Sequence, residues 1–256
     1  MKTNDAAPIA ASIACPTFTP ATPASARGLA ALLVLDAVLA FAPLVVLGAA
    51  IGWPASLGKP AAGQLAAIHA NAGAVTAGYG LYLLYSVLVA PALIGLAARV
   101  FGGLQRPLAA TVAAFAALSV LSRAIGILRW LTVMPMLAGA HASADPAQRL
   151  QIELVFNAIT TYGGGIGEVL GVSLFMAIAL GLLSLGAWRN GALPRPLAGA
   201  GGVIAGALAA LSLPVFGGPV LMPVAVAVSG LSLWMIVVGV WCWRTAPPAQ
   251  QHSFMK

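Results

Sequence analysis

The stretch that decides the fold is residues 107–139, PLAATVAAFAALSVLSRAIGILRWLTVMPMLAG. It contains two charged residues, Arg123 and Arg129, and it is longer than the roughly 20 residues that an α-helix needs to cross a bilayer. The whole chain has the same character, since 61% of its 256 residues are hydrophobic and 7% are charged. Soluble domains carry roughly 25% charged residues, so lipid must be the solvent of this protein.

Outward from this stretch, the sequence predicts an all-α, polytopic membrane protein built as a bundle of about six transmembrane helices. Residues 1–27, rich in Ala, Pro, Thr and Ser, are expected to be a disordered cytoplasmic tail. The transmembrane domain covers 28–244, and a cytoplasmic tail follows over 245–256. The predicted spans are 29–53, 74–100, 107–139, 162–188, 197–216 and 220–243.

Orientation follows from the basic residues. Eight Lys and Arg fall on the side of the two termini, two on the opposite side and two inside a span. The positive-inside rule therefore predicts that both termini lie in the cytoplasm of a bacterial inner membrane. The net charge of +7 is distributed in ones and twos at span ends, whereas nucleic-acid binding needs a clustered basic face. The expected partner is the lipid bilayer and not nucleic acid.

The fourth helix is too long for a simple span. Asp145-Pro146 is typical of a helix start, and residues 146–188 as one rod would measure about 65 Å, roughly twice the hydrocarbon thickness. We therefore predict a kink at residues 163–165, Gly-Gly-Gly, with the first half of the helix at or above the outer surface. Residues 54–73 are expected to form an outer loop with a short amphipathic segment.

Four ionisable residues fall inside the spans, where charges are rare and usually pair in the bundle interior: Asp36, Arg123, Arg129 and Glu168. Helical rise places Arg123 and Glu168 at a similar depth in the outer half, and they are the preferred pair. Arg129 is turned about 120° from Arg123 on the helix and is expected to snorkel to the outer headgroups. Asp36 lies nearer the cytoplasm.

Polar residues on neighbouring faces extend this group. Glu153, Asn157 and Glu168 fall on one stripe of the fourth helix, and Tyr79, Tyr82 and Ser86 share a face of the second. The candidate ligand-binding residues are therefore Arg123, Glu168, Asn157, Glu153 and Tyr82, with Asp36 and Arg129 as further buried charges.

Two interpretations of these charges stay open. Arg123 and Glu168 either form a buried ion pair that sets helix register, or line an outward-opening cavity that binds or transports a small polar or anionic solute. A membrane enzyme is an alternative, but the sequence has no HExxH, GxSxG or paired-carboxylate arrangement. We therefore favour a non-enzymatic protein, and we expect neither a metal site nor a cofactor.

A third class is a non-catalytic structural or regulatory membrane subunit. Small residues recur at every fourth position over Ala198, Gly202, Gly206 and Ala210. In lipid, such a face lets two helix backbones approach closely. It predicts a homo-oligomer or a membrane partner that packs on the Gly202/Gly206 face.

The order of the spans from Leu29 to Trp243 resembles the domain-of-unknown-function 4386 (DUF4386) family of six-span bacterial membrane proteins. The similarity includes the polar outer loop before Tyr79, Arg123 in the third span, and the turn LPRPLAG at 193–199, which leads into a Gly-rich helix. The resemblance implies the six-helix fold and the membrane location, and it carries over no activity and no catalytic residue.

Overall fold

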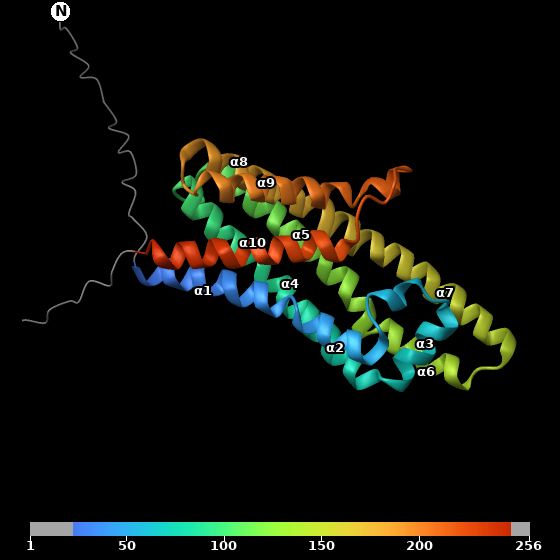
Figure 1. Ribbon diagram of the computed structural model, residues 1–256. Coiled ribbons are helices and arrows are strands. Elements are labelled where there is room, and N and C mark those ends of the chain that lie inside the picture. The colour runs from blue at the N-terminus through green and yellow to red at the C-terminus, as the bar shows by residue number, and fades with distance from the viewer. Residues whose placement is uncertain (1–22, 247–256) are drawn as a thin grey trace, which may run out of the picture.

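The computed structural model describes residues 23–246, and within them the chain forms helices and no strand (Figure 1). Three short elements, labelled η, are 3₁₀ or π turns. The elements are α1 Pro23–Leu39, α2 Ala42–Ile51, η1 Ala55–Gly58, α3 Ala61–Ala70, α4 Ala72–Phe101, α5 Pro107–Leu131, α6 Val133–Ser143, α7 Pro146–Gly164, η2 Gly165–Phe175, α8 Met176–Asn190, α9 Arg195–Ala210, η3 Leu213–Phe216 and α10 Val224–Arg244.

Five helical segments of the described chain are long and apolar enough to cross a membrane. The prediction of a helical membrane bundle is confirmed. Predicted span 197–216 instead contains α9, which is apolar but has 16 residues, followed by the short η3. The five long segments are Ser25–Ile51, Ala72–Phe101, Pro107–Ser143, Pro146–Asn190 and Val224–Arg244.

Two of the predicted spans are each divided into two helices, and a proline explains each division. Pro43 has no N–H to donate to the carbonyl group of Leu39, which is where α1 ends. Pro135 has the same effect on the carbonyl group of Leu131, the last residue of α5. At the start of the chain, α1 begins at Pro23, inside the segment predicted as a tail; residues 1–22 of that tail and 247–256 of the other lie outside the described residues.

One end of the bundle gathers the basic residues, and we call it the basic end (left in Figure 1). There the guanidinium of Arg27 lies 5.9 Å from the ring centroid of Trp243, and that of Arg99 lies 5.7 Å from that of Trp241. The Asn190 side chain donates a hydrogen bond of 2.7 Å to the carbonyl oxygen of Val100, which ties the end of α8 to the end of α4. Two arginines therefore pack on two tryptophan rings at this end.

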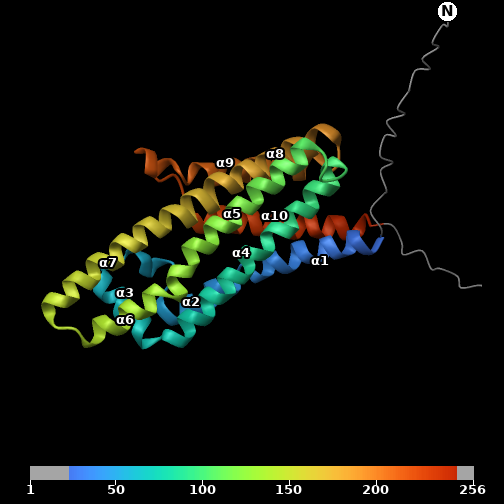
Figure 2. The same cartoon turned by 180° about the vertical axis from the view of Figure 1, so that it is seen from behind.

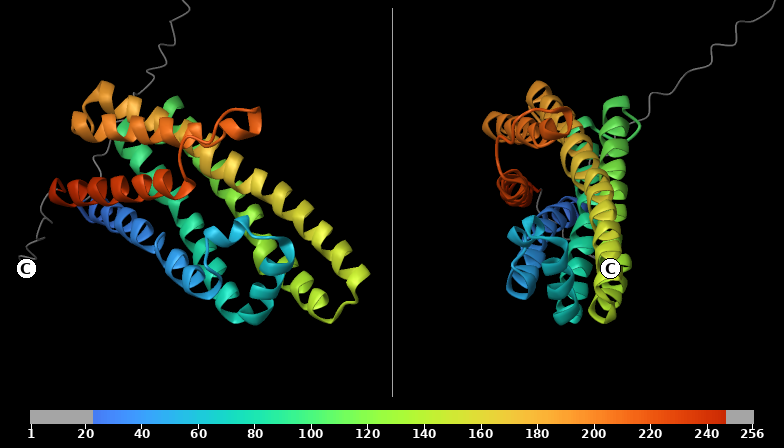
Figure 3. Two further views of the ribbon diagram at one scale, coloured as in Figure 1. Left: turned by 45° about the vertical axis from the view of Figure 1, so that its right-hand side comes forward. Right: turned by 90° about the vertical axis from the view of Figure 1, so that its right-hand side faces the viewer.

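The opposite end, which we call the cap end, is formed by α3, α6 and the first half of α7 (Figure 3). The carboxylate of Asp145 accepts hydrogen bonds of 2.9 Å from the amides of Ala147 and Gln148, so the predicted helix start is confirmed. The predicted outer amphipathic segment is α3, which buries Leu65 and Ile68 against α6 and α7.

The fourth predicted helix is one rod from Pro146 to Asn190, and it bends where α7 passes into α8 (Figure 2). The bend coincides with eleven residues of π-helix that begin at Gly165, the last residue of the predicted glycine kink. Glycine places no side chain in the way of the wider π turn, and π turns within α-helices are frequent at functional sites.

The rod crosses α5 with almost no side chain between the two backbones. A Cβ atom added to Gly126 would lie 2.8 Å from the Cα atom of Gly167. The hydroxyl of Ser119 donates a hydrogen bond of 2.7 Å to the carbonyl oxygen of Gly171. This crossing positions the site, because the two arginines of α5 lie on either side of it.

Candidate functional site

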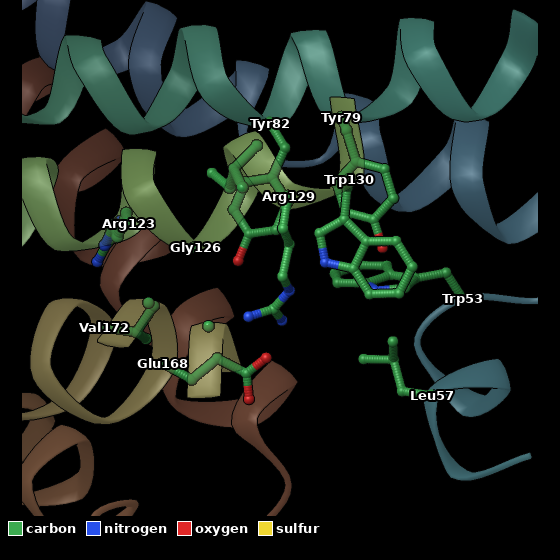
Figure 4. A pocket seen from close by; sticks show the side chains of 13 residues that line it. Trp53, Leu57, Tyr79, Tyr82, Arg123, Gly126, Arg129, Trp130, Glu168 and Val172 are labelled. Atoms are coloured by element: carbon green, nitrogen blue, oxygen red, sulfur yellow. The ribbon is translucent and has the colours of Figure 1, made fainter. Parts of the chain in front are cut away.

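A small polar cavity lies beside the crossing of α5 and η2 (Figure 4). Its volume is about 40 Å³, room for a few water molecules, since about 10–15 Å³ suffices for one. Five elements contribute to it, η1, α4, α5, α7 and η2, together with Trp53 from the turn before η1. The side chains that define its chemistry are those of Leu57, Tyr79, Tyr82, Arg123, Arg129, Trp130 and Glu168.

Arg123 is buried deeply, with 2% of its surface exposed. Its Nη1 donates a hydrogen bond of 3.1 Å to the hydroxyl of Tyr85. Within the described residues, its Nε and Nη2 atoms have no hydrogen-bond partner. Its aliphatic stem packs on Gly171, where an added Cβ would lie 2.9 Å from the Arg123 Cγ. The glycine therefore makes room for the arginine.

Arg129 is also buried, with 9% exposed, and its side chain lies over Gly163. Its Nε and Nη1 atoms find no hydrogen-bond partner in the part of the chain that the structure describes. Figure 4 shows its guanidinium pointing toward the carboxylate of Glu168, with the Tyr82 hydroxyl aimed at the same centre. Arg129 is the basic residue that acts electrostatically on Glu168.

The pairing therefore differs from the one predicted. Arg129 does not snorkel, because it extends over Gly163 into the bundle, and it faces Glu168 in place of Arg123. Arg123 interacts electrostatically with Asp36 of α1, which is 1% exposed. Among residues 23–246, neither arginine comes within 4.0 Å of a carboxylate oxygen.

Aromatic rings form the wall opposite the crossing. Trp130 stacks on Tyr79 with ring centroids 4.8 Å apart, Tyr79 on Tyr82 at 6.4 Å, and Tyr82 on Tyr85 at 5.5 Å. Trp53 meets Tyr82 edge-on at 5.9 Å. Tyr85 belongs to the same stack and accepts the hydrogen bond from Arg123. The stack holds the hydroxyl groups and the arginine side chains in place.

A second, larger cavity of about 420 Å³ adjoins the polar one. It lies between the start of α2, η1 and the first turns of α10, and its walls are mostly apolar, with Phe41, Leu44 and Val228 among them. Trp53, Leu57, Tyr82 and Glu168 line both cavities. These four residues form the junction between a polar and an apolar space.

Two candidate residues lie away from both cavities. Asn157 is exposed on α7. Glu153 accepts a contact of 3.0 Å from the His141 ring at the cap end, where it joins α7 to α6. Both fall on the predicted polar stripe, but they lie on the part of α7 that is nearer the cap end than the cavity. Of that stripe, the side chain that lines the cavity is Glu168.

Sequence reasoning missed Trp53 and Leu57, because they come from the segment between α2 and α3 and only the tertiary fold brings them over the charges. It also left Trp130 and Tyr79 out of the candidate set. A signal for Trp130 existed, since Ser119, Arg123, Gly126 and Trp130 share one helix face in the sequence, and that whole face is buried.

The arrangement supplies hydrogen-bond donors in excess. Arg123 and Arg129 present four unpartnered guanidinium nitrogens within the described structure, and the Tyr79 hydroxyl has no partner there either. No group of three or more His, Cys, Asp and Glu side chains that could hold a metal occurs among the described residues. The site is chemically suited to an occupant rich in acceptor oxygens.

One protein-family model matches most of the chain. The model of the family described as "Domain of unknown function (DUF4386)" matches residues 19–239, which is most of the chain. No curated protein and no solved structure gives a match. The matched range contains the crossing of α5 and η2 and all residues that line the two cavities. The protein belongs to the DUF4386 family of membrane proteins.

Proposed function

We propose that this protein crosses the bacterial inner membrane six times, with both termini in the cytoplasm, and binds a solute with a small, oxygen-rich group in the polar cavity. The basic end then faces the cytoplasm, as the positive-inside rule requires. The cap end, with α3 and α6, lies at the outer surface. The sixth pass is α9, which with 16 residues is short for a span.

The observation that carries the binding proposal is the burial of two arginines whose nitrogens lack partners. A buried donor left without an acceptor costs about 1–3 kcal/mol, and more when it is charged. Water or a ligand oxygen removes that cost. Because an ion pair with Glu168 or Asp36 at 4.0 Å or less is not formed in the described structure, a purely structural pair does not account for these groups.

The first test uses a small carboxylate as the probe. The purified protein in phosphatidylcholine nanodiscs is unfolded by heat in sodium acetate and in sodium chloride of equal ionic strength. Acetate is expected to raise the unfolding temperature, since a ligand at 100 times its Kd stabilises the folded state by about 2.7 kcal/mol. Arg129→Gln is expected to remove the shift, and Arg129→Lys to leave part of it, because lysine keeps the charge without the planar fork.

The matched control is Arg149→Gln, which makes the same change at an exposed arginine of α7 outside both cavities. It should respond to acetate as the wild type does. The proposal is wrong if acetate leaves the wild type unchanged, or if it stabilises Arg129→Gln as much as the wild type.

An additional role as a membrane subunit has one observation in its favour. A Cβ atom added to Gly202 or Gly206 would meet nothing within 4 Å, and the neighbouring Val203 is 75% exposed. This smooth face of α9 is where a homo-oligomer or another membrane protein would pack. Cross-linking in membranes followed by co-purification, with and without Gly202→Leu, tests it, and an unchanged pattern excludes this face.

A further inference from the structure

We infer that the ligand is a single-chain amphiphile, with a carboxylate headgroup in the polar cavity and its hydrocarbon chain in the apolar cavity. The inference rests on the proposed function, because it uses the same two arginines. It adds the chemical class of the ligand and the route by which that ligand enters.

The polar cavity and the apolar cavity are connected. Trp53, Leu57, Tyr82 and Glu168 belong to the lining of both. A molecule whose end occupies the polar cavity can therefore continue into the apolar one past this junction. Ligands that are polar at one end and apolar over the rest have this shape and this distribution of polarity.

The headgroup follows from the size and charge of the polar cavity. About 40 Å³ accommodates a carboxylate, whereas a sugar or phosphocholine headgroup is much larger. The lining contains two arginines and one glutamate, and four of the guanidinium nitrogens have no partner among the described residues, so they are free to donate to a carboxylate. The remaining nearby charge, Asp36 on α1, lies outside the lining and acts on Arg123. Arginine pairs with carboxylates through two parallel hydrogen bonds.

The hydrocarbon chain of the ligand is inferred from the larger, apolar cavity. Its volume of about 420 Å³ lies in the range of about 300–1,000 Å³ that is typical of ligand pockets, and its walls are mostly apolar. Leu44 on α2 is 37% exposed and Val224 on α10 is 42% exposed, although both line it. In a membrane, these exposed walls face lipid. A hydrocarbon chain can therefore enter sideways from the bilayer, between α2 and α10.

Glu168 is placed to regulate entry. It lies at the junction, is exposed, and its carboxylate points toward the guanidinium of Arg129 (Figure 4). A carboxylate headgroup that approaches Arg129 meets this negative charge first and competes with it. Glu168 is thus expected to weaken binding, and its neutral analogue Gln to strengthen it.

The experiment measures binding of tritiated palmitate to the protein in phosphatidylcholine nanodiscs by scintillation proximity, with empty nanodiscs subtracted. Unlabelled palmitate should compete fully. Hexadecanol, which has the same chain without the charge, should compete at least about tenfold more weakly, since a charge-assisted hydrogen bond contributes about 1.5–3 kcal/mol. Acetate, which has the charge without the chain, should also compete more weakly than palmitate.

Three variants separate the parts of the site. Arg129→Gln should weaken palmitate binding about tenfold or more, while the exposed Arg149→Gln should not. Glu168→Gln should strengthen it. Ser229→Phe fills the apolar cavity and should weaken palmitate binding while acetate still stabilises the protein. Its control is Val226→Phe on the same helix, where the residue is 58% exposed and lines neither cavity.

The outcomes distinguish the two proposals. If acetate stabilises the protein through Arg129 but palmitate binds no more tightly than acetate, the amphiphile inference is wrong and the proposed function stands. If acetate has no effect and palmitate binding is equal in the wild type, Arg129→Gln and Ser229→Phe, both are wrong, because the palmitate has only partitioned into the lipid. Weaker binding by Glu168→Gln would overturn the role of Glu168 as a competitor.

Discussion

The two halves of the bundle are packed by different means. Toward the basic end, one large cluster of buried apolar side chains joins α1, α4, α5, α8, α9 and α10, with the buried Asp36 beside it on α1. The indole N–H of Trp234 there donates a hydrogen bond of 2.8 Å to the carbonyl oxygen of Leu197. In the half that contains the polar cavity, Arg123 and Arg129 are buried about as deeply as Trp234. Most of their guanidinium nitrogens nevertheless have no hydrogen-bond partner in the described structure.

The difference teaches that the charges are not needed for packing. Helices in lipid associate through close van der Waals contacts and small residues, and the apolar half shows that this chain has enough of both. Buried charges in a bilayer carry a desolvation cost. The half that keeps two buried arginines at that cost is the half in which we expect function.

The largest expected effect on stability comes from replacing the buried Arg123 of the cavity half by an apolar residue. Arg123→Met should lower the free energy of unfolding, because it removes both the positive charge that acts on the buried Asp36 and the donor of the hydrogen bond to Tyr85. The double variant Arg123→Met with Asp36→Leu should recover most of that loss. Thermal or denaturant unfolding in detergent measures both. Equal losses in the single and the double variant would show that the two residues are not coupled.

A smaller effect is expected at the crossing itself. A Cβ at Gly171 would lie within 3.0 Å of the Arg123 amide nitrogen and the Ser119 carbonyl oxygen, both backbone atoms that cannot move aside alone. Gly171→Val should therefore destabilise the protein by up to about 3 kcal/mol. Gly80→Val is the matched control on α4, where an added Cβ meets nothing within 4 Å. Similar unfolding temperatures for the two variants would contradict the close approach of α5 and η2.

The smallest effect concerns the hydrogen bond that Arg123 does make. Tyr85→Phe keeps the ring stack but removes the acceptor of the Arg123 Nη1, and it should cost about 1.5 kcal/mol. Tyr79→Phe removes a hydroxyl that has no partner in the described structure and should be neutral or slightly stabilising in the absence of ligand. Unfolding curves of the two variants side by side check the contrast, and its reversal would place the functional hydroxyl on Tyr79.

The fold was readable from sequence because the strongest signals are local. Length and hydropathy predict the long helices, Asp145-Pro146 predicts the start of α7, and the three glycines predict where the rod bends. The helix breaks at Pro43 and Pro135 are not predicted, although each proline is visible in the sequence, because the apolar run continues through both prolines.

The site was readable in part. Arg123, Glu168 and Tyr82 line the polar cavity, whereas Asn157 and Glu153 lie outside it. The predicted pair of Arg123 with Glu168 was wrong because depth and helix angle predict only where Cα atoms lie. The long side chain of an arginine places its guanidinium several ångströms away from its Cα atom. Arg129 crosses that distance over Gly163, a neighbour more than thirty residues away in the chain.

By itself, the sequence determined that lipid surrounds this chain, where its long apolar helices lie, and which four charges fall within them. Those properties depend on composition and on periodicity along the chain. Only the tertiary structure decided which arginine faces Glu168, that Trp53 and Leu57 close the site, and that a polar cavity opens into an apolar one. They depend on how separate helices cross, and crossing is set by small residues and side-chain reach acting across large separations in sequence.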